Sequence, residues 1–270
     1  MSLTRLDICL EDYEIGLTGA IPDRGDWSEP AMDRGILEFV ALFSGIVFKY
    51  GGRIVHGCHP TFTPVILRQA RMQAGKRFRK PVTLVMSDLW ARDLSEEDIE
   101  SMIDIAEFVI TRKEGDGGPE NTETRNRSLT AMRGVLIDAQ NVMVAVGGKM
   151  HSGDGKVPGV AEEMKLAEDK GIPRFLIAGL GGFAKELAKK LTPSSLSNSL
   201  SHDENVTLFG TNDVSASVNL LFEHFARSEA LAKSALQPVK WNPDLRVILD
   251  HRDGTIRSET TKYILRTVAV

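Results

Sequence analysis

The residues between Asn141 and Glu163 have the types and the spacing of a site for phosphate and ribose. An apolar run from Val142 to Val146, rich in β-branched residues, is followed directly by Gly147-Gly148-Lys149. Glycine lets a backbone turn sharply and approach a ligand closely, and lysine adds a positive point charge. We therefore expect Gly147, Gly148 and Lys149 to bind an anion at the end of a buried strand.

Two adjacent acids, Glu162 and Glu163, lie in the first turn of the next predicted helix, which runs from Val160 to Lys170. Acids in the first turn of a helix stabilise its dipole by about 0.3 to 1 kcal/mol, and that alone would explain them. The alternative is chemical, because a carboxylate there can accept hydrogen bonds from ribose hydroxyls or stabilise an oxocarbenium ion while an N-glycosidic bond breaks. Arg133 and Lys149 would neutralise phosphate, although an arginine on a long helix is more often a solvated surface residue.

A second candidate turn follows the predicted strand Arg53–His56. The residues from Gly57 to Pro64 precede a predicted helix at Val65–Ala74, which Thr61 or Thr63 would cap. A helix N-terminus preceded by glycine and small hydroxyls attracts anions, although such a loop can also be a simple connection. The candidate ligand-binding residues of this turn are Gly57, His59, Thr61 and Thr63.

Two further turns have the same character. Thr18-Gly19 ends the first predicted strand, and Gly181-Gly182 leads into a predicted helix at Phe183–Leu191. Several such turns at one sheet edge would offer backbone amides to phosphate, and we expect those of Gly19, Gly57, Gly148 and Gly181 to do so.

Other chemistries lack their motifs. The sequence has no Walker phosphate loop, and no GxGxxG opens a helix with the acidic partner that a dinucleotide oxidoreductase requires. His56 and His59 flank a tight turn without a third metal ligand nearby, and Cys9 and Cys58 fit no metal spacing. We expect neither a metal nor a cofactor.

Strand and helix patterns alternate six times along the chain, which predicts an α/β fold with a doubly wound, mostly parallel, Rossmann-like sheet. A further short strand is expected at Val206–Phe209 and a helix at Ser215–Ala232. The predicted organisation is a nucleotide-ligand-binding domain over residues 1–232 and a β-rich C-terminal extension over residues 233–270.

The composition limits the class of partner. With 33 basic and 37 acidic side chains the net charge is −4, which favours neither nucleic acid nor an anionic membrane. No apolar stretch reaches the ~18 residues of a membrane span, and the N-terminus lacks the pattern of an export signal. We expect a cytoplasmic protein.

Three motifs together resemble the SLOG superfamily: Thr18 to Pro22, Gly51 to Pro64, and Val146 to Glu163. The resemblance extends over about residues 14 to 230 and implies a Rossmann-like sheet that binds a ribose phosphate at its carboxyl edge. Members include the Lonely Guy phosphoribohydrolases, which release cytokinin bases from nucleoside monophosphates, and sensor domains for nucleotide-derived signals.

The details are more similar to the sensor branch. The hydrolases carry Pro-Gly-Gly-x-Gly-Thr-x-x-Glu, whereas here Val146 replaces the proline, Lys149 follows the glycines and the loop to the acids is longer. The resemblance implies that Arg133, or alternatively Arg127, holds the ligand together with Lys149 and Glu163.

The expected function is therefore sensing or sequestration of a nucleotide-derived small molecule, such as an ADP-ribose-like or cyclic nucleotide signal. The alternative is an N-glycoside hydrolase or transferase acting on nucleoside monophosphates, with Glu162 or Glu163 as the catalytic carboxylate. We expect a homodimer or higher homo-oligomer, with a separate effector protein as a further partner.

Overall fold

The structure is a computed structural model that describes residues 9–23, 25, 29–75, 79–151 and 157–232. Its helices and strands, in chain order, are β1 (Glu14–Ala20), α1 (Pro30–Lys49), β2 (Arg53–His56), α2 (Thr63–Gln73), β3 (Val82–Ser87), α3 (Asp88–Ala91), α4 (Glu96–Glu100), β4 (Ala106–Thr111), α5 (Thr122–Asp138), β5 (Val142–Gly147), α6 (Gly159–Asp169), β6 (Arg174–Ile177), α7 (Gly182–Ala188), the 3₁₀ helix η1 (Pro193–Leu196), α8 (His202–Gly210) and α9 (Val214–Ala232).

The strands form one parallel sheet in the order β4-β3-β2-β1-β5-β6. The chain winds outward from β1 to β4, then returns to the other side of β1 and continues through β5 and β6. This confirms the expected Rossmann-like α/β fold. The winding direction changes between β1 and β5, and open α/β sheets bind ligands at the carboxyl ends of the strands at such a point.

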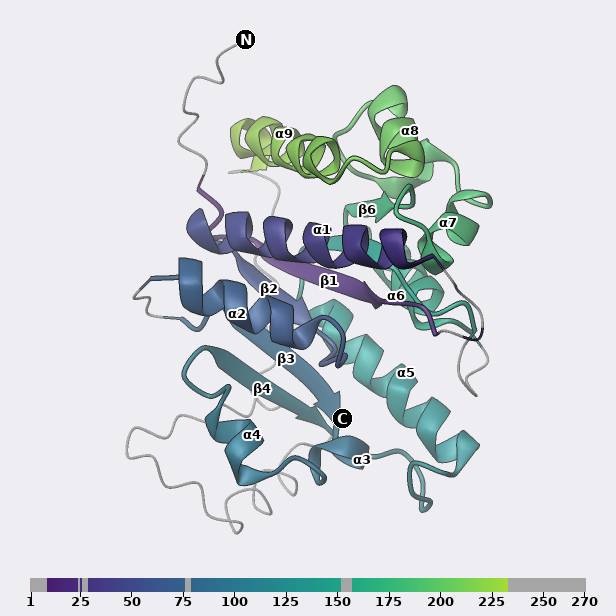
Figure 1. Ribbon diagram of the computed structural model, residues 1–270. Helices are drawn as coiled ribbons and strands as arrows, with labels where there is room; N and C mark the ends of the chain where they lie inside the picture. Colours follow the sequence, from purple (N-terminus) through teal and green to yellow (C-terminus); the bar gives the residue numbers. More distant parts are fainter. Residues whose placement is uncertain (1–8, 24, 26–28, 76–78, 152–156, 233–270) are drawn as a thin grey trace.

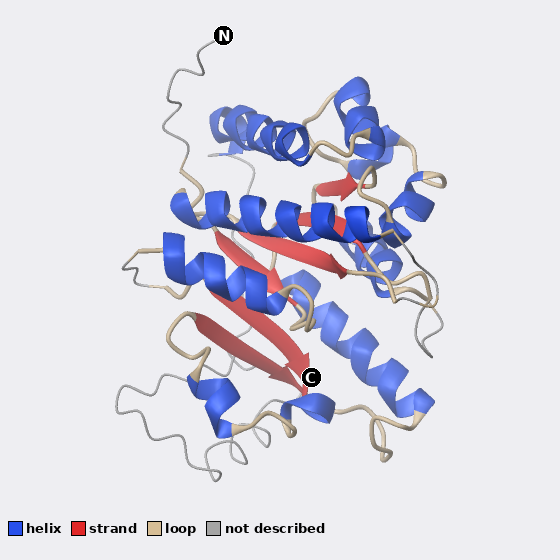
Figure 2. Cartoon of the chain, viewed as in Figure 1, coloured by secondary structure: helices blue, strands red, loops and turns tan. Residues whose placement is uncertain are grey.

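Helices cover both faces of the sheet (Figures 1 and 2). One apolar core joins α1, α2 and α9 to one face, and a second joins α5, α6 and α7 to the other. Along β5, Val142, Val144 and Val146 belong to the first core, while Met143 and Ala145 belong to the second. The apolar run that the sequence shows is therefore buried on both faces, as expected of a central parallel strand.

A buried arginine joins the amino ends of the strands. Arg53 at the start of β2 contacts Glu14 of β1 through Nη1 at 2.6 Å and Glu107 of β4 through Nη2 at 2.9 Å. Its Nη2 also donates to the hydroxyl of Thr83 in β3 at 3.0 Å. Two ion pairs and one hydrogen bond of Arg53 thus join four strands at the amino edge, and the carboxyl edge is where the ligand-site residues gather.

Two local expectations are wrong. Val206–Phe209 is not a strand but part of α8, because Ser201 and Glu204 form a capping box that starts a helix at His202. Neither Thr61 nor Thr63 caps α2, since Phe62 occupies the N-cap position and makes no side-chain capping bond. The predicted β-rich extension at 233–270 lies outside the described residues. Within the described residues, no helix combines the length and the apolar character needed to cross a bilayer.

Candidate functional site

A pocket of ≈ 430 Å³ lies at the carboxyl ends of β1, β2 and β5, where the winding direction changes. Its walls bring together eight residues that the sequence singles out: Thr18 and Gly19 from β1, Gly57 and His59 after β2, Arg133 from α5, Gly148 and Lys149 after β5, and Glu163 from α6. Residues separated by up to 145 positions in the chain therefore meet in one cavity, as the shared edge of a parallel sheet requires.

Glu163 places a carboxylate in this pocket. The residue is only 8% exposed, and its side chain accepts a hydrogen bond from the hydroxyl of Thr18. Burial raises the pKa of Glu163 above its ordinary value, whereas Arg133 and Thr18 act in the opposite direction. A buried carboxylate with acceptor capacity left over suits a ligand that presents hydroxyl groups.

Glu162 points elsewhere. Its Oε2 pairs with Nη1 of Arg133, and its Oε1 accepts a hydrogen bond from the hydroxyl of Thr130 at 2.7 Å. It does not line the pocket, so it joins α6 to α5. Of the two candidate catalytic carboxylates, only Glu163 faces the cavity.

Arg133 therefore lies between two carboxylates. Its Nε is 3.6 Å from Oε1 of Glu163, and 14% of its side chain is exposed. The alternative that Arg133 is a solvated surface residue is therefore wrong. Arg127, the competing choice, is 58% exposed and pairs with Glu114 at 3.7 Å outside the pocket.

Two histidines form the side of the pocket near β2. Nδ1 of His56 donates to the carbonyl of Leu17 at 2.8 Å, and Nε2 accepts from the amide of His59 at 3.1 Å. These partners fix the neutral tautomer of His56, and burial lowers its pKa. Burial, and then His56 and Lys149, lower the pKa of His59 to about 4.

Lys149 lies at the edge of the pocket and remains accessible. Its Nζ is 3.2 Å from Oδ1 of Asp23, and the two side chains are 42% and 58% exposed. An exposed pair of this kind is worth about 0 to 1 kcal/mol, so a ligand anion can replace Asp23 at little cost.

The paired glycines mainly serve close packing of backbones. The amide of Gly148 donates to the carbonyl of Ala20 at 2.7 Å, and the amide of Gly181 donates to the carbonyl of Ala178 at 2.9 Å. A Cβ on Gly182 would lie 2.6 Å from the carbonyl carbon of Gly147. Gly147, Gly181 and Gly182 do not line the pocket. The expectation that the amides of Gly148 and Gly181 cradle phosphate is therefore wrong.

The turn before α2 is also satisfied internally. The amides of Phe62 and Thr63 donate to the carbonyl of His59 at 3.2 and 3.0 Å, and the amide of Thr61 donates to Nδ1 of His59 at 3.3 Å. The Thr63 hydroxyl donates to the same carbonyl at 2.8 Å. Thr61 and Thr63 lie outside the pocket lining and order the loop that presents His59.

Sequence patterns missed one wall of the pocket. Trp90 of α3 and Leu129 and Met132 of α5 line it beside the polar groups. Leu129, Met132 and Arg133 follow the spacing of one helix face, which is a signal that the sequence carries. Trp90 has no comparable signal, because α3 is a single short turn.

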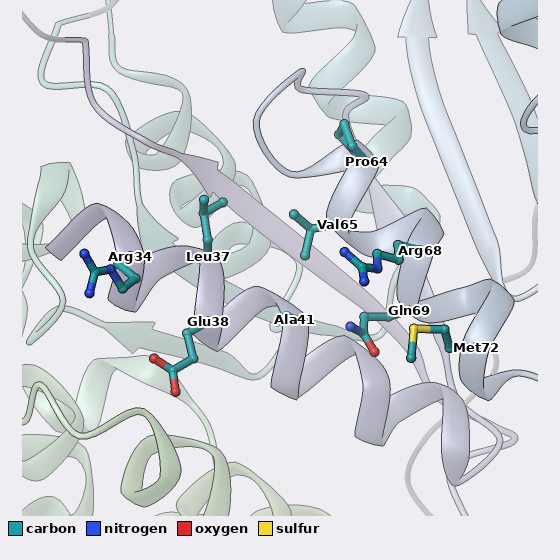
Figure 3. A pocket seen from close by; sticks show the side chains of 9 residues that line it. All are labelled: Arg34, Leu37, Glu38, Ala41, Pro64, Val65, Arg68, Gln69 and Met72. Carbon is teal, nitrogen blue, oxygen red and sulfur yellow. The ribbon is translucent and has the colours of Figure 1, made fainter. Parts of the chain in front are cut away.

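A second hollow, of ≈ 600 Å³, lies between α1 and α2 (Figure 3). Its charged side chains, Arg34, Glu38 and Arg68, are exposed, and none of the predicted ligand residues lines it. Among the described residues, no group of three or more His, Cys, Asp or Glu has the arrangement of a metal site. The candidate site is therefore the smaller pocket at the sheet edge.

Comparisons with known proteins were made for the sequence and for the fold. A family model described as SLOG cluster2 matches residues 42–211, a segment that includes His59, Arg133, Lys149 and Glu163. No curated protein matches the sequence significantly. The X-ray structure of TM1055, a structural genomics target, aligns with 78% of this chain and 99% of its own, at 14% identity and a TM-score of 0.46.

Proposed function

This chain belongs to the SLOG cluster2 family, and we propose that its pocket binds a nucleotide-derived small molecule, such as an ADP-ribose-like or cyclic nucleotide signal. Family membership supports a nucleotide-related function in general. The observation that carries the finer proposal is Glu163, a buried carboxylate in a pocket at the winding change of the sheet. Such a group binds neighbouring hydroxyls of a ribose with both of its oxygens.

The two cations of the pocket, Arg133 and Lys149, have different roles. Arg133 is already paired with Glu162 and lies beside Glu163, so its charge holds those carboxylates in place. Among the described residues Lys149 pairs with the exposed Asp23, and it is the cation that a phosphate would recruit. We therefore assign ribose binding to Glu163 and phosphate binding to Lys149.

Thermal unfolding of the purified protein with AMP, ADP-ribose, cyclic ADP-ribose and cyclic dinucleotides tests the proposal. A ligand at 100 times its dissociation constant adds about 2.7 kcal/mol of stability, which shifts the unfolding midpoint measurably. Glu163→Gln and Lys149→Met should each abolish most of that shift. The controls Glu123→Gln and Lys165→Met, at exposed positions outside the pocket, should keep it. If none of these compounds shifted the unfolding midpoint, the proposal would be contradicted.

A second candidate is hydrolysis of a nucleoside monophosphate, and the same residue favours it. Glu163 could stabilise the positive charge that develops on the ribose as the C1′–N bond breaks. Water would then add its oxygen to C1′, and one of its protons would leave with the base. Chromatography of each mixture decides between the two candidates: ligand recovered intact indicates a sensor or store, whereas free base that disappears in Glu163→Gln indicates hydrolysis.

A sensor needs a way to pass on its signal. We propose that the protein acts as a homodimer or through a separate effector protein. Light scattering with and without the ligand tests this, since a monomer in both conditions would exclude the dimer.

A further inference from the structure

Trp90 is an aromatic side chain that the fold leaves accessible at the pocket. It belongs to α3, whose other residues, Asp88, Leu89 and Ala91, are buried, while Trp90 is partly exposed and lines the cavity. A large indole ring in this position has surface that the described residues do not cover.

The short helix that carries Trp90 is firmly anchored. The hydroxyl of Ser87 accepts a hydrogen bond from the amide of Leu89 at 3.2 Å and so caps the helix. The side chain of Arg92 forms an ion pair with Asp88 at 3.0 Å. Since β3 and β4 pair along their whole length up to Ser87 and Thr111, the helix starts from a fixed strand end. The ring is therefore presented from a rigid base, which lowers the entropy cost of a contact with a ligand.

Apolar side chains accompany the ring. Leu129 and Met132 of α5 lie three positions apart on one helix face and line the same cavity. Together with Trp90 they form an apolar wall, whereas Lys149 and Glu163 supply the charges. The pocket is thus divided into an apolar part and a polar part, the division that a nucleotide shows between its base and its ribose phosphate.

The strand order sets Trp90 and Lys149 apart within the pocket. Trp90 follows β3 and Lys149 follows β5, and the order β3-β2-β1-β5 puts three strand spacings, about 14 Å, between the two strand ends. A ribose phosphate alone is too short to contact both Trp90 and Lys149 over such a span. A ligand that also carries a base reaches further along the edge.

We propose that Trp90 stacks on the nucleobase of the ligand, with Leu129 and Met132 against the rest of the base, so that the pocket selects nucleotides over base-free ribose phosphates. This inference rests on the proposed function and adds that the nucleobase supplies much of the ligand's affinity. Stacking of one base on an aromatic side chain strengthens binding about tenfold to hundredfold.

Calorimetric titration with two probes, AMP and ribose 5-phosphate, tests the inference. The wild-type protein should bind AMP more tightly than ribose 5-phosphate. Trp90→Ala should weaken AMP binding about tenfold to hundredfold and leave ribose 5-phosphate binding unchanged. Trp90→Phe, which keeps a smaller ring, should restore most of the affinity for AMP.

Tryptophan fluorescence supplies an independent readout of the same contact. The chain has three tryptophans, and AMP should quench emission in the wild-type protein but not in Trp90→Phe. Equal affinity of the wild-type protein for the two probes, or an equal loss for both in Trp90→Ala, would overturn this inference while leaving the proposed function standing. Binding of neither probe at millimolar concentration would overturn this inference, and the proposed function would fall with it only if ADP-ribose, cyclic ADP-ribose and the cyclic dinucleotides also gave no thermal shift.

Discussion

Nε of Arg133 lies 3.6 Å from Oε1 of Glu163, while Nη1 of the same guanidinium pairs with Glu162. One cation therefore holds two neighbouring carboxylates of α6, and it does so from α5. Of the three side chains only Glu163 and Arg133 line the pocket, so the pair at the site is stabilised by a third residue outside it.

Arg133→Met should destabilise the protein by about 3 kcal/mol at pH 8, because it leaves a buried carboxylate without its cation. Without Arg133, the pKa of Glu163 in the folded protein rises further above its unfolded value. The native state then binds the extra proton, so stability falls as the pH rises through the folded pKa, and the loss should be smaller at pH 5. Urea denaturation at both pH values measures this.

Arg127→Met is the matched control for that experiment. Arg127 lies on the same helix but is 58% exposed, so its replacement should change stability by no more than about 0.5 kcal/mol. A loss in Arg133→Met that is equal at pH 5 and pH 8 would argue against the buried pair with Glu163.

Gly19→Ala should destabilise the protein severely, by about 4 kcal/mol or more. Gly19 has φ of +139°, and a Cβ there would lie 1.8 Å from the carbonyl oxygen of Val146, its neighbour in β5. Gly134→Ala is the contrasting case, since no atom lies within 4 Å of its added Cβ and α5 continues through it. That substitution should stabilise by about 0.5 to 1 kcal/mol. Thermal denaturation measures both changes in stability. A stabilising Gly19→Ala together with a destabilising Gly134→Ala would contradict this packing.

Stability should fall as the pH is lowered from 6.5 toward 4. His59 has a pKa of about 4 in the folded protein against 6.5 for the free side chain, so in this window only the unfolded chain takes up the proton. The resulting loss reaches up to about 3 kcal/mol and levels off below the folded pKa. His56 adds to it, because burial lowers its pKa as well.

Urea denaturation at several pH values measures the slope. His59→Asn should flatten it, since asparagine can still accept from Thr61 but does not titrate. An unchanged slope in His59→Asn would exclude His59 as its source.

Cys58 should react slowly with iodoacetamide in the folded protein. Burial raises the pKa of its thiol to about 11, although a hydrogen bond with Thr63 opposes the rise. At pH 8 its thiolate fraction is then about 100-fold below that of an ordinary cysteine. Cys9 is exposed and should be labelled first. Mass spectrometry of a labelling time course would show the order, and equal rates would contradict it.

The strands could be predicted from the sequence because each is a short apolar run between turn residues. The strand Arg53–His56 has the predicted bounds. Val206–Phe209 has the residue types of a short strand, but the capping box that begins at Ser201 makes it part of a helix. A capping signal several residues upstream determines the local structure there.

The candidate site was predictable where it depends on sheet topology alone. Lys149 and Glu163 follow β5, and the carboxyl ends of parallel strands share an edge, so their meeting needs no further knowledge. The pairing of Arg133 with Glu162 depends on how α5 packs against α6, and the exposure of Trp90 depends on a single turn after β3. Both the Arg133–Glu162 pair and the exposure of Trp90 are set by three-dimensional packing that the sequence does not reveal.

The backbone groups at this sheet edge are largely committed to the fold, with the amides of Gly148, Thr61 and Thr63 bound within the chain. In the binding mode proposed above, recognition depends mainly on side chains. A protein that binds phosphate with its main chain keeps that preference through most substitutions, whereas in the proposed mode one change at Trp90 or Lys149 would alter the ligand and leave the framework intact. Close relatives that share this framework are therefore free to diverge in what they bind, and comparing their side chains at these two positions would follow that divergence.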